Sequence, residues 1–164
     1  MMIDPRYTDS MAGKETAWLA IRPGTDAAFA EAVAYEMINS PLFDAQSRPF
    51  IEKHCVGFDA ASIDAQKAEF EASGDATKQA YAAHMDSTQN YHDYIMGLNS
   101  FAAQGARTPE WAEKICGIPA AKIRYIADKL MTAKAPYIVV GAGVNRQANG
   151  EQNMRALYML SVLT

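Results

Sequence analysis

The sequence predicts an α/β fold with a mainly parallel sheet, and three observations lead to that prediction. Two short apolar runs, Trp18–Arg22 and Tyr137–Val140, have the composition of buried strands, and a glycine follows each of them closely. Amphipathic stretches of helical period lie between the two runs. Because parallel strands need a long crossover connection, this order of elements is typical of a parallel sheet covered by helices.

The first half of the chain begins with a strand and a helix. Trp18–Arg22 is a short apolar run that ends at Pro23–Gly24, a strong turn signal. Thr25 and Asp26 suit the N-terminal cap and first turn of a helix. The apolar side chains of that helix recur every four residues along one face: Phe29, Val33 and Met37.

The middle of the chain predicts a different kind of structure. Ser40–Pro41 ends the first helix, and residues 44–55 predict a second short helix that Pro49 either interrupts or begins. Residues 59–90 are rich in Ala, Gln, Asp, Glu and Lys and poor in large apolar side chains. We expect residues 59–90 to form a helical excursion on the surface, and we assign it no function.

The last third of the chain carries the clearest signals. Thr108 followed by Pro109 predicts a helix start, Gly117 predicts its end and Pro119 opens the next helix. That helix has an apolar stripe formed by Ile123, Ile126, Ala127, Leu130 and Met131. Tyr137–Val140 is the best strand of the sequence, and a helix follows from about Asn149. Together these elements predict a Rossmann-like three-layer domain.

Both ends of the chain fall inside predicted elements. The sequence opens on the last residues of a strand before Asp4–Pro5, without a leader, and stops within an apolar helical stretch, residues 156–164. We therefore expect residues 1–164 to be an internal fragment of one α/β domain, truncated at both ends.

Composition excludes several classes of protein. The chain has 164 residues, 49% of them hydrophobic and 21% charged, as in soluble globular domains. A net charge of −4 argues against a nucleic-acid partner, because such binding needs a basic surface. Cys55 and Cys116 are too few for an iron–sulfur cluster, and we expect buried free thiols. His54, His84 and His92 lack metal-ligand spacing, so the sequence predicts neither a metal site nor a catalytic constellation.

Three loops follow predicted strands, at the sheet edge where α/β folds bind ligands. In the first, Asp4 can accept hydrogen bonds and Arg6 can pair with a phosphate, although an Asp–Pro turn explains the same residues. In the second, Gly24 permits a tight turn, and Asp26 suits either the N–H donors of a guanine or simple interaction with the helix dipole.

The third loop, residues 141–150, begins as Gly-x-Gly, like a dinucleotide-binding turn. Arg146 stands where the third glycine of that motif belongs, which argues against an ordinary NAD-binding domain. The arginine can instead pair with a diphosphate or pterin oxygen, or it can simply point into solvent.

Taken together, the segments IDPRYTDS, IRPGTDAA and GAGVNRQANGEQ resemble large subunits of dimethyl sulfoxide reductase-like molybdopterin oxidoreductases. CVGFD, YHDYIMGL and RTPEWAEKICGIPAAKI are similar to that family too, so the resemblance covers nearly all of the chain outside residues 60–90. The third loop departs from the pattern. Ala142 stands where relatives often carry tryptophan and Gln147 where they often carry histidine, which leaves the substrate open.

The resemblance implies a molybdenum-dependent parent enzyme of anaerobic respiration that transfers an oxygen atom and holds bis(molybdopterin guanine dinucleotide). It implies that Asp4, Arg6 and Thr8 lie near a nucleotide end and that Pro23, Gly24, Thr25 and Asp26 meet a guanine. Gly141, Ala142, Gly143 and Arg146 would lie near the pterin or diphosphate.

The resemblance also implies parts that residues 1–164 do not contain. The molybdenum ligand and a [4Fe–4S] motif lie upstream in the family, so we expect the fragment to hold no cofactor and to be inactive alone. The implied partners are the rest of the large subunit, an iron–sulfur electron-transfer subunit and a membrane anchor. The parent is expected in the periplasm or on the outer face of the cytoplasmic membrane. The alternative is a free-standing Rossmann-like nucleotide-binding module.

Overall fold

The computed structural model describes all of residues 1–164, and the chain divides into two compact units. The first unit combines residues 1–43 with residues 107–164, and the second consists of residues 44–106. The second unit therefore extends beyond the helical excursion predicted for residues 59–90.

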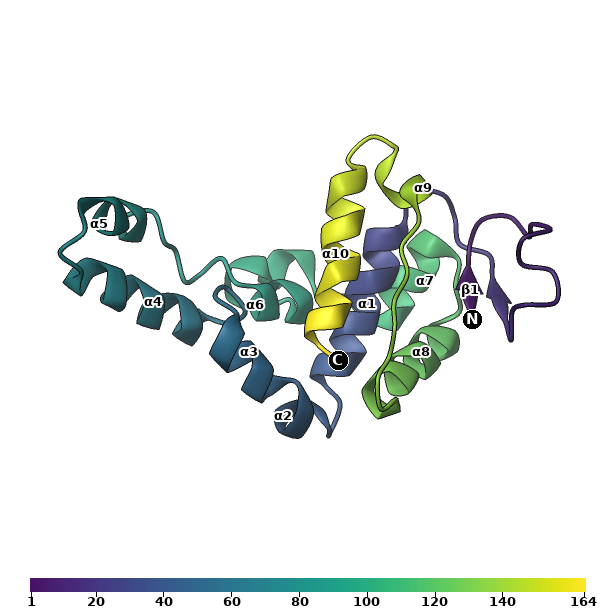
Figure 1. Cartoon of the computed structure of the whole chain (residues 1–164), viewed down its shortest axis with the longest axis horizontal. Coiled ribbons are helices and arrows are strands. Elements are labelled where there is room, and N and C mark those ends of the chain that lie inside the picture. Colours follow the sequence, from purple (N-terminus) through teal and green to yellow (C-terminus); the bar gives the residue numbers. More distant parts are fainter. The chain divides into compact units, whose positions relative to one another are not determined.

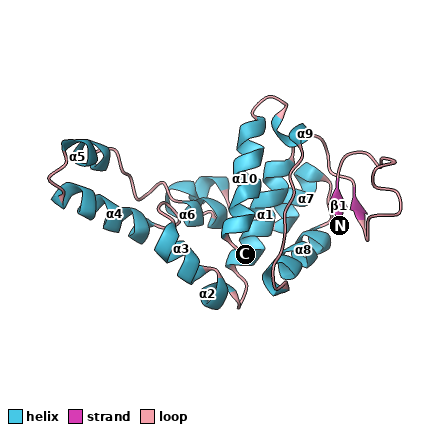
Figure 2. Ribbon diagram, in the orientation of Figure 1, coloured by secondary structure: helices cyan, strands magenta, loops and turns pink.

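The first unit contains two strands and five helices (Figures 1 and 2). In chain order these elements are β1 (Met2–Ile3), β2 (Trp18–Leu19), α1 (Asp26–Ile38), α7 (Pro109–Cys116), α8 (Ala120–Thr132), α9 (Ala142–Asn145) and α10 (Gly150–Val162). Helix α2 (Phe43–Gln46) begins at the last residue of this unit's first segment. The helix starts predicted at Thr25–Asp26, at Pro109 and at about Asn149 are confirmed, and the helix predicted to open at Pro119 has that residue as its N-terminal cap and begins at Ala120.

Helix α1 is the centre of the first unit, because α7, α8 and α10 all pack against it (Figure 1). Phe29, Val33 and Met37, the predicted apolar face, are buried as expected. Ala30, Ala32 and Ala34 are also buried completely. These alanines let neighbouring helices approach α1 on more than the one face that the sequence predicts.

The helices around α1 begin and end as the sequence predicts. The Thr108 side chain accepts a hydrogen bond from the Trp111 backbone N–H at 3.2 Å, and Pro109 stands at the first position of α7. Gly117 ends α7 in the left-handed region with φ +79°. In α8, Ile123, Ile126, Ala127 and Met131 of the predicted stripe are buried.

The sheet is much smaller than the sequence predicts. Strands β1 and β2 pair in parallel, with Met2 opposite Trp18 and Ile3 opposite Leu19, and they form the whole sheet. The predicted strand Trp18–Arg22 thus extends only to Leu19. The parallel direction is confirmed, whereas a three-layer arrangement with a larger sheet is absent from residues 1–164.

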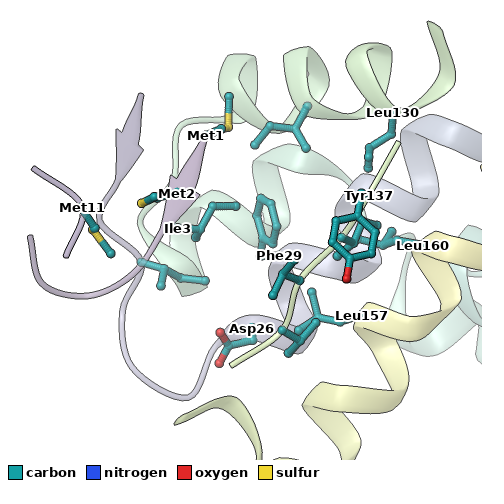
Figure 3. Close-up of a pocket in the computed structure, with 15 residues that line it drawn as sticks. Met1, Met2, Ile3, Met11, Asp26, Phe29, Leu130, Tyr137, Leu157 and Leu160 are labelled. Atoms are coloured by element: carbon teal, nitrogen blue, oxygen red, sulfur yellow. The ribbon is translucent and has the colours of Figure 1, made fainter. Parts of the chain in front are cut away.

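The prediction of a strand at Tyr137–Val140 is wrong for this structure. The segment pairs with no other strand, and its Tyr137 and Val139 are 90% and 75% exposed. An apolar hollow of about 540 Å³ lies between this segment and β1, over Phe29 and Leu160 (Figure 3). Because no strand occupies that space, the backbone of the segment has no partner with which to form a ladder.

The second unit is helical throughout. Its elements are the rest of α2, α3 (Arg48–His54), α4 (Ala60–Ala72), α5 (Ala76–Ala82), α6 (Tyr91–Met96) and a 3-10 helix, η1 (Asn99–Gln104). Pro49 lies in the first turn of α3, so it begins that helix and does not interrupt it. Most side chains of α4 and α5 are exposed, in agreement with their polar composition.

A buried carboxylate organises the end of this unit. Asp93 accepts hydrogen bonds from the side-chain amides of Asn90 at 2.9 Å and Asn99 at 2.7 Å, and its other oxygen lies 3.2 Å from His92 Nδ1. These contacts hold the pKa of Asp93 below its usual range, with Asn99 contributing most and burial opposing the shift. The carboxylate thereby joins α6 to η1.

Candidate functional site

The first loop begins where the sheet ends. The Asp4 backbone N–H donates to the Leu19 carbonyl at 3.2 Å, and the Trp18 indole donates to the Asp4 carbonyl at 2.9 Å. The Asp4 side chain accepts from the Arg6 backbone N–H at 2.8 Å and closes a tight turn. Asp4 is therefore fixed at the carboxyl end of β1.

The rest of the first loop turns back on itself. The Tyr7 hydroxyl donates to Glu15 at 2.6 Å, and the Tyr7 ring meets Trp18 edge-on at 5.5 Å between centroids. The Thr8 carbonyl accepts from the Met11 backbone N–H at 2.9 Å. Arg6 is exposed.

The second loop is shaped by a glycine and an arginine. Gly24 has φ +77°, a conformation that side chains disfavour. The Thr25 hydroxyl donates to the Arg22 carbonyl at 2.7 Å and does not cap the helix as predicted. The Arg22 guanidinium donates to the carbonyls of Lys114 and Ile115 at 2.6 and 2.9 Å, so it caps the end of α7.

Asp26 lies in the first turn of α1 and is partly buried. Burial raises the pKa of its carboxyl group, and hydrogen bonds from its own backbone N–H and from Gln147 oppose that shift. The next backbone N–H, that of Ala27, donates to Asn153 Oδ1 in α10 at 3.1 Å. The N-terminus of α1 is thus attached to the loop and helix that follow residue 140.

The third loop contains a single helical turn, α9. After it, the backbone at Gly150 passes close to the backbone of Val144 and Asn145. A Cβ atom on Gly150 would lie 2.3 Å from the Asn145 carbonyl oxygen and 2.7 Å from that of Val144. The Gln147 side chain folds inward, and its Nε2 donates to the Val144 carbonyl at 3.1 Å. Arg146 follows α9 as its C-terminal cap and is exposed.

The three loops converge on one hollow of about 200 Å³. It is lined by Asp4 and Pro5 of the first loop, Pro23, Gly24 and Asp26 of the second, and Gly141, Gly143, Val144 and Gln147 of the third. The sequence predicts that Asp4, Asp26 and Arg146 face one common cleft, and of these three only Asp4 and Asp26 line this hollow. Arg6, Thr8, Thr25, Ala142 and Arg146, which the resemblance also implicates, do not line the hollow.

The sequence did not select Gln147, Val144 or Pro5 as site residues. Gln147 was notable only as a departure from the pattern of relatives, and no local signal shows that its side chain turns toward Gly24 and Asp26. Pro5 and Val144 could have been found only as neighbours of selected residues.

The chemistry of the hollow is that of a hydrogen-bond acceptor. Its charged side chains are the carboxylates of Asp4 and Asp26, and no lysine or arginine lines it. Carboxylates of this kind accept hydrogen bonds from ring N–H and amino groups and repel phosphate. The glycines leave backbone exposed for close approach by a flat group.

Two further features bear on function. No group of three or more His, Cys, Asp or Glu side chains is arranged to hold a metal ion. No helix is both long enough and apolar enough to span a lipid bilayer.

The sequence model of the family described as "Molybdopterin oxidoreductase" matches residues 1–164. The chain belongs to the molybdopterin oxidoreductase family. It is 43% identical to the putative dimethyl sulfoxide reductase chain YnfE of Escherichia coli K12 and 41% identical to the dimethyl sulfoxide reductase DmsA of Haemophilus influenzae. Both matches cover all of this chain and 18% of the relative.

A more distant relative in the molybdopterin oxidoreductase family is the trimethylamine-N-oxide reductase of Vibrio parahaemolyticus. It is 29% identical over 93% of this chain and 14% of its own length. The chain therefore spans less than a fifth of the length of these relatives.

Proposed function

We propose that residues 1–164 are part of the catalytic subunit of a molybdenum oxidoreductase of the dimethyl sulfoxide reductase type. The parent enzyme would transfer an oxygen atom to or from a small substrate. The relatives named as dimethyl sulfoxide reductase chains support this proposal by matching the whole chain at 40–43% identity.

The observation that carries the proposal is the hollow formed by the three loops. We assign it to the guanine end of a molybdopterin guanine dinucleotide, because guanine presents a ring N–H and an amino group that carboxylates recognise. Its volume of about 200 Å³ lies below the roughly 300–1,000 Å³ of complete ligand pockets, so it suits one ring system and not a whole dinucleotide.

Particular residues would hold the cofactor. Asp26 would accept hydrogen bonds from the guanine, Asp4 and Pro23 would flank it, and the backbone near Gly141 and Gly143 would face the adjoining part of the cofactor. Arg6 and Arg146, exposed on the first and third loops, would pair with its phosphates. When bound, the cofactor supplies the redox chemistry of the molybdenum, and this segment supplies position and electrostatics.

We further propose that the rest of the parent protein completes the Rossmann-like sheet. The apolar hollow between β1 and residues 137–140 is lined by Ile3, Phe29, Ile138, Val140 and Leu160, among others (Figure 3). An apolar strand from outside residues 1–164, parallel to β1, would bury these side chains and pair with the open backbone of residues 137–140. It would turn the two-stranded sheet into a larger one.

The remaining parts of the proposal concern the parent complex. It would contain two molybdopterin guanine dinucleotides, a [4Fe–4S] cluster, an iron–sulfur electron-transfer subunit and a membrane anchor. We propose that it works in the periplasm or at the outer face of the cytoplasmic membrane. Residues 1–164 alone would be inactive.

The experiment compares the full-length enzyme with its Asp26→Ala variant. Molybdenum and guanine nucleotide are measured in each purified protein, together with reduction of dimethyl sulfoxide by a reduced viologen dye. We expect the variant to lose most of its bound cofactor and activity. Full cofactor content and full activity in the variant would contradict the assignment of the hollow.

A further inference from the structure

Arg22 stands at the start of the second loop, and both its backbone and its side chain are hydrogen-bonded. Its backbone N–H donates to the Cys116 carbonyl at 2.9 Å. Its Nη1 donates to the carbonyls of Lys114 and Ile115 at 2.6 and 2.9 Å. Its own carbonyl accepts from the Thr25 hydroxyl at 2.7 Å, which closes the turn. One residue therefore joins the second loop to the end of α7.

The end of α7 suits an arginine. The last carbonyls of a helix have no helical partner, and the negative end of the helix dipole attracts a cation. Gly117 ends α7 with φ +79°, and the Arg22 side chain lies against it. A Cβ atom placed on Gly117 would be 3.5 Å from Arg22 Nε and 3.7 Å from Cζ. The guanidinium is thus held at the helix end, and it does not line the hollow.

The second loop is fixed at its other end as well. The Ala27 backbone N–H donates to Asn153 Oδ1 at 3.1 Å. Between the two fixed ends, the ring of Pro23 restricts the backbone and Gly24 has φ +77°. Pro23, Gly24 and Asp26 all line the hollow. The shape of this side of the hollow is therefore set by contacts outside it.

We propose that Arg22 is a positioning residue that holds the second loop in the shape that receives a guanine base. This inference rests on the proposed function, because it assumes that the hollow is the guanine site. A loop that is already ordered binds more tightly, since binding does not have to order it. When only a fraction of the molecules have the competent shape, the apparent affinity falls by that fraction. Arg22 acts through the loop and not by contact with the base.

The test uses full-length protein prepared without molybdenum cofactor, with guanosine and GDP as the probes. Calorimetry measures both affinities for the wild type, Arg22→Met and Arg22→Lys, at a temperature where circular dichroism shows each protein to be folded. Methionine keeps an unbranched apolar side chain and cannot donate hydrogen bonds. Lysine keeps the cation and can donate to the same carbonyls, so this variant keeps the test decisive if the methionine variant unfolds.

Arg124→Met is the matched control. Arg124 lies in α8 and pairs with Glu36 of α1 and Glu110 of α7, so it also joins helices of the first unit. It does not line the hollow. Its replacement should leave both affinities at their wild-type values.

We expect Arg22→Met to weaken the binding of guanosine and GDP by the same factor, about tenfold, the effect of losing two hydrogen bonds of ordinary strength. The factor should be the same because both probes carry the base, and the loop that receives the base is what changes. Arg22→Lys should recover most of the affinity, with a loss of about threefold or less.

Wild-type affinity for both probes in Arg22→Met and Arg22→Lys would overturn the inference. A loss of affinity for GDP alone would also overturn it, because Arg22 would then pair directly with the phosphates. An equal loss in Arg124→Met would do the same, because loosening any helix contact would then weaken binding.

Asp26→Asn separates these failures from that of the proposed function. If Asp26→Asn abolishes the binding of both probes while the Arg22 variants bind normally, only the role of Arg22 is wrong. If Asp26→Asn binds both probes as the wild type does, the assignment of the hollow to guanine is wrong, and the inference falls with it.

Discussion

The Oδ1 atom of Asn153 accepts a hydrogen bond from the Ala27 backbone N–H at 3.1 Å, although 126 residues separate the two. Asn153 is 93% buried, since only 7% of its surface is exposed. The first turn of a helix leaves its N–H groups without helical partners, and Asn153 satisfies one of them. The contact fixes α10, and with it the third loop, against the second loop.

Replacing Asn153 with alanine should therefore destabilise the first unit. The change leaves the partly buried Ala27 N–H without its acceptor. It should lower the free energy of unfolding by about 1–3 kcal/mol. Hydrogen exchange of peptides from α1 and α10 in the full-length protein measures the effect as faster local opening. Gln152→Ala is the control, and equal exchange in the two variants would contradict this role.

Gly150 should not tolerate a side chain. A Cβ atom there would lie 2.3 Å from the Asn145 carbonyl oxygen, so Gly150→Ala must displace the backbone of the third loop. Gly143→Ala is the matched control, because a Cβ atom at Gly143 meets nothing within 4 Å. We expect a lower melting temperature for Gly150→Ala than for Gly143→Ala. Equal melting temperatures would show that the close approach is absent.

The sequence predicted the helices well because their signals are local. Thr108 with Pro109, and the stripe of α8, contain within a few residues the information needed to place a helix end or a buried face. The prediction of a strand at residues 137–140 failed because a strand forms only beside another strand with which its backbone can hydrogen-bond. Its β-branched composition is correct for a buried strand, but the space beside it is an empty hollow.

The candidate site was predictable in outline only. The three loops could be chosen because glycines and aspartates follow predicted strands, and the sheet-edge rule brings such loops together. The direction of each side chain was not predictable. Arg22 turns away to cap α7, Arg146 points outward, and Gln147 turns in toward Asp26. Those directions depend on contacts between residues far apart in sequence.

The buried ion pair between Arg107 and Glu31 should contribute more to the stability of the fold than the exposed pair between Arg124 and Glu110. The Arg107 and Glu31 side chains are 10% and 13% exposed, their charged atoms lie 3.5 Å apart, and Arg107 stacks over Trp111. Glu31→Ala removes the carboxylate that faces the buried Arg107 guanidinium, and it should lower the free energy of unfolding by about 3 kcal/mol. Glu110→Ala, whose side chain is 57% exposed, should change stability little. Thermal melting of both variants checks this order, and the reverse order would contradict it.

The second unit should loosen in acid around Asp93. The pKa of Asp93 is lowered in the folded state, so the carboxylate contributes stability above the ordinary aspartate pKa, and that contribution is lost as the pH falls through the lowered pKa. The protection of residues 90–99 against hydrogen exchange, taken relative to the intrinsic exchange rate at each pH, should therefore fall in acid. Asp93→Asn should remove most of that pH dependence. If the variant keeps the same pH dependence as the wild type, a titrating group other than Asp93 causes it.

The most direct test of the central claim is the structure of the full-length protein with its molybdenum cofactor bound, determined by crystallography or electron cryomicroscopy. We predict a guanine ring in the hollow between Asp4, Pro23 and Gly24, with its N–H groups within hydrogen-bond distance of the Asp26 carboxylate. A bound cofactor whose guanines all lie elsewhere, with side chains or solvent filling this hollow, would contradict the account.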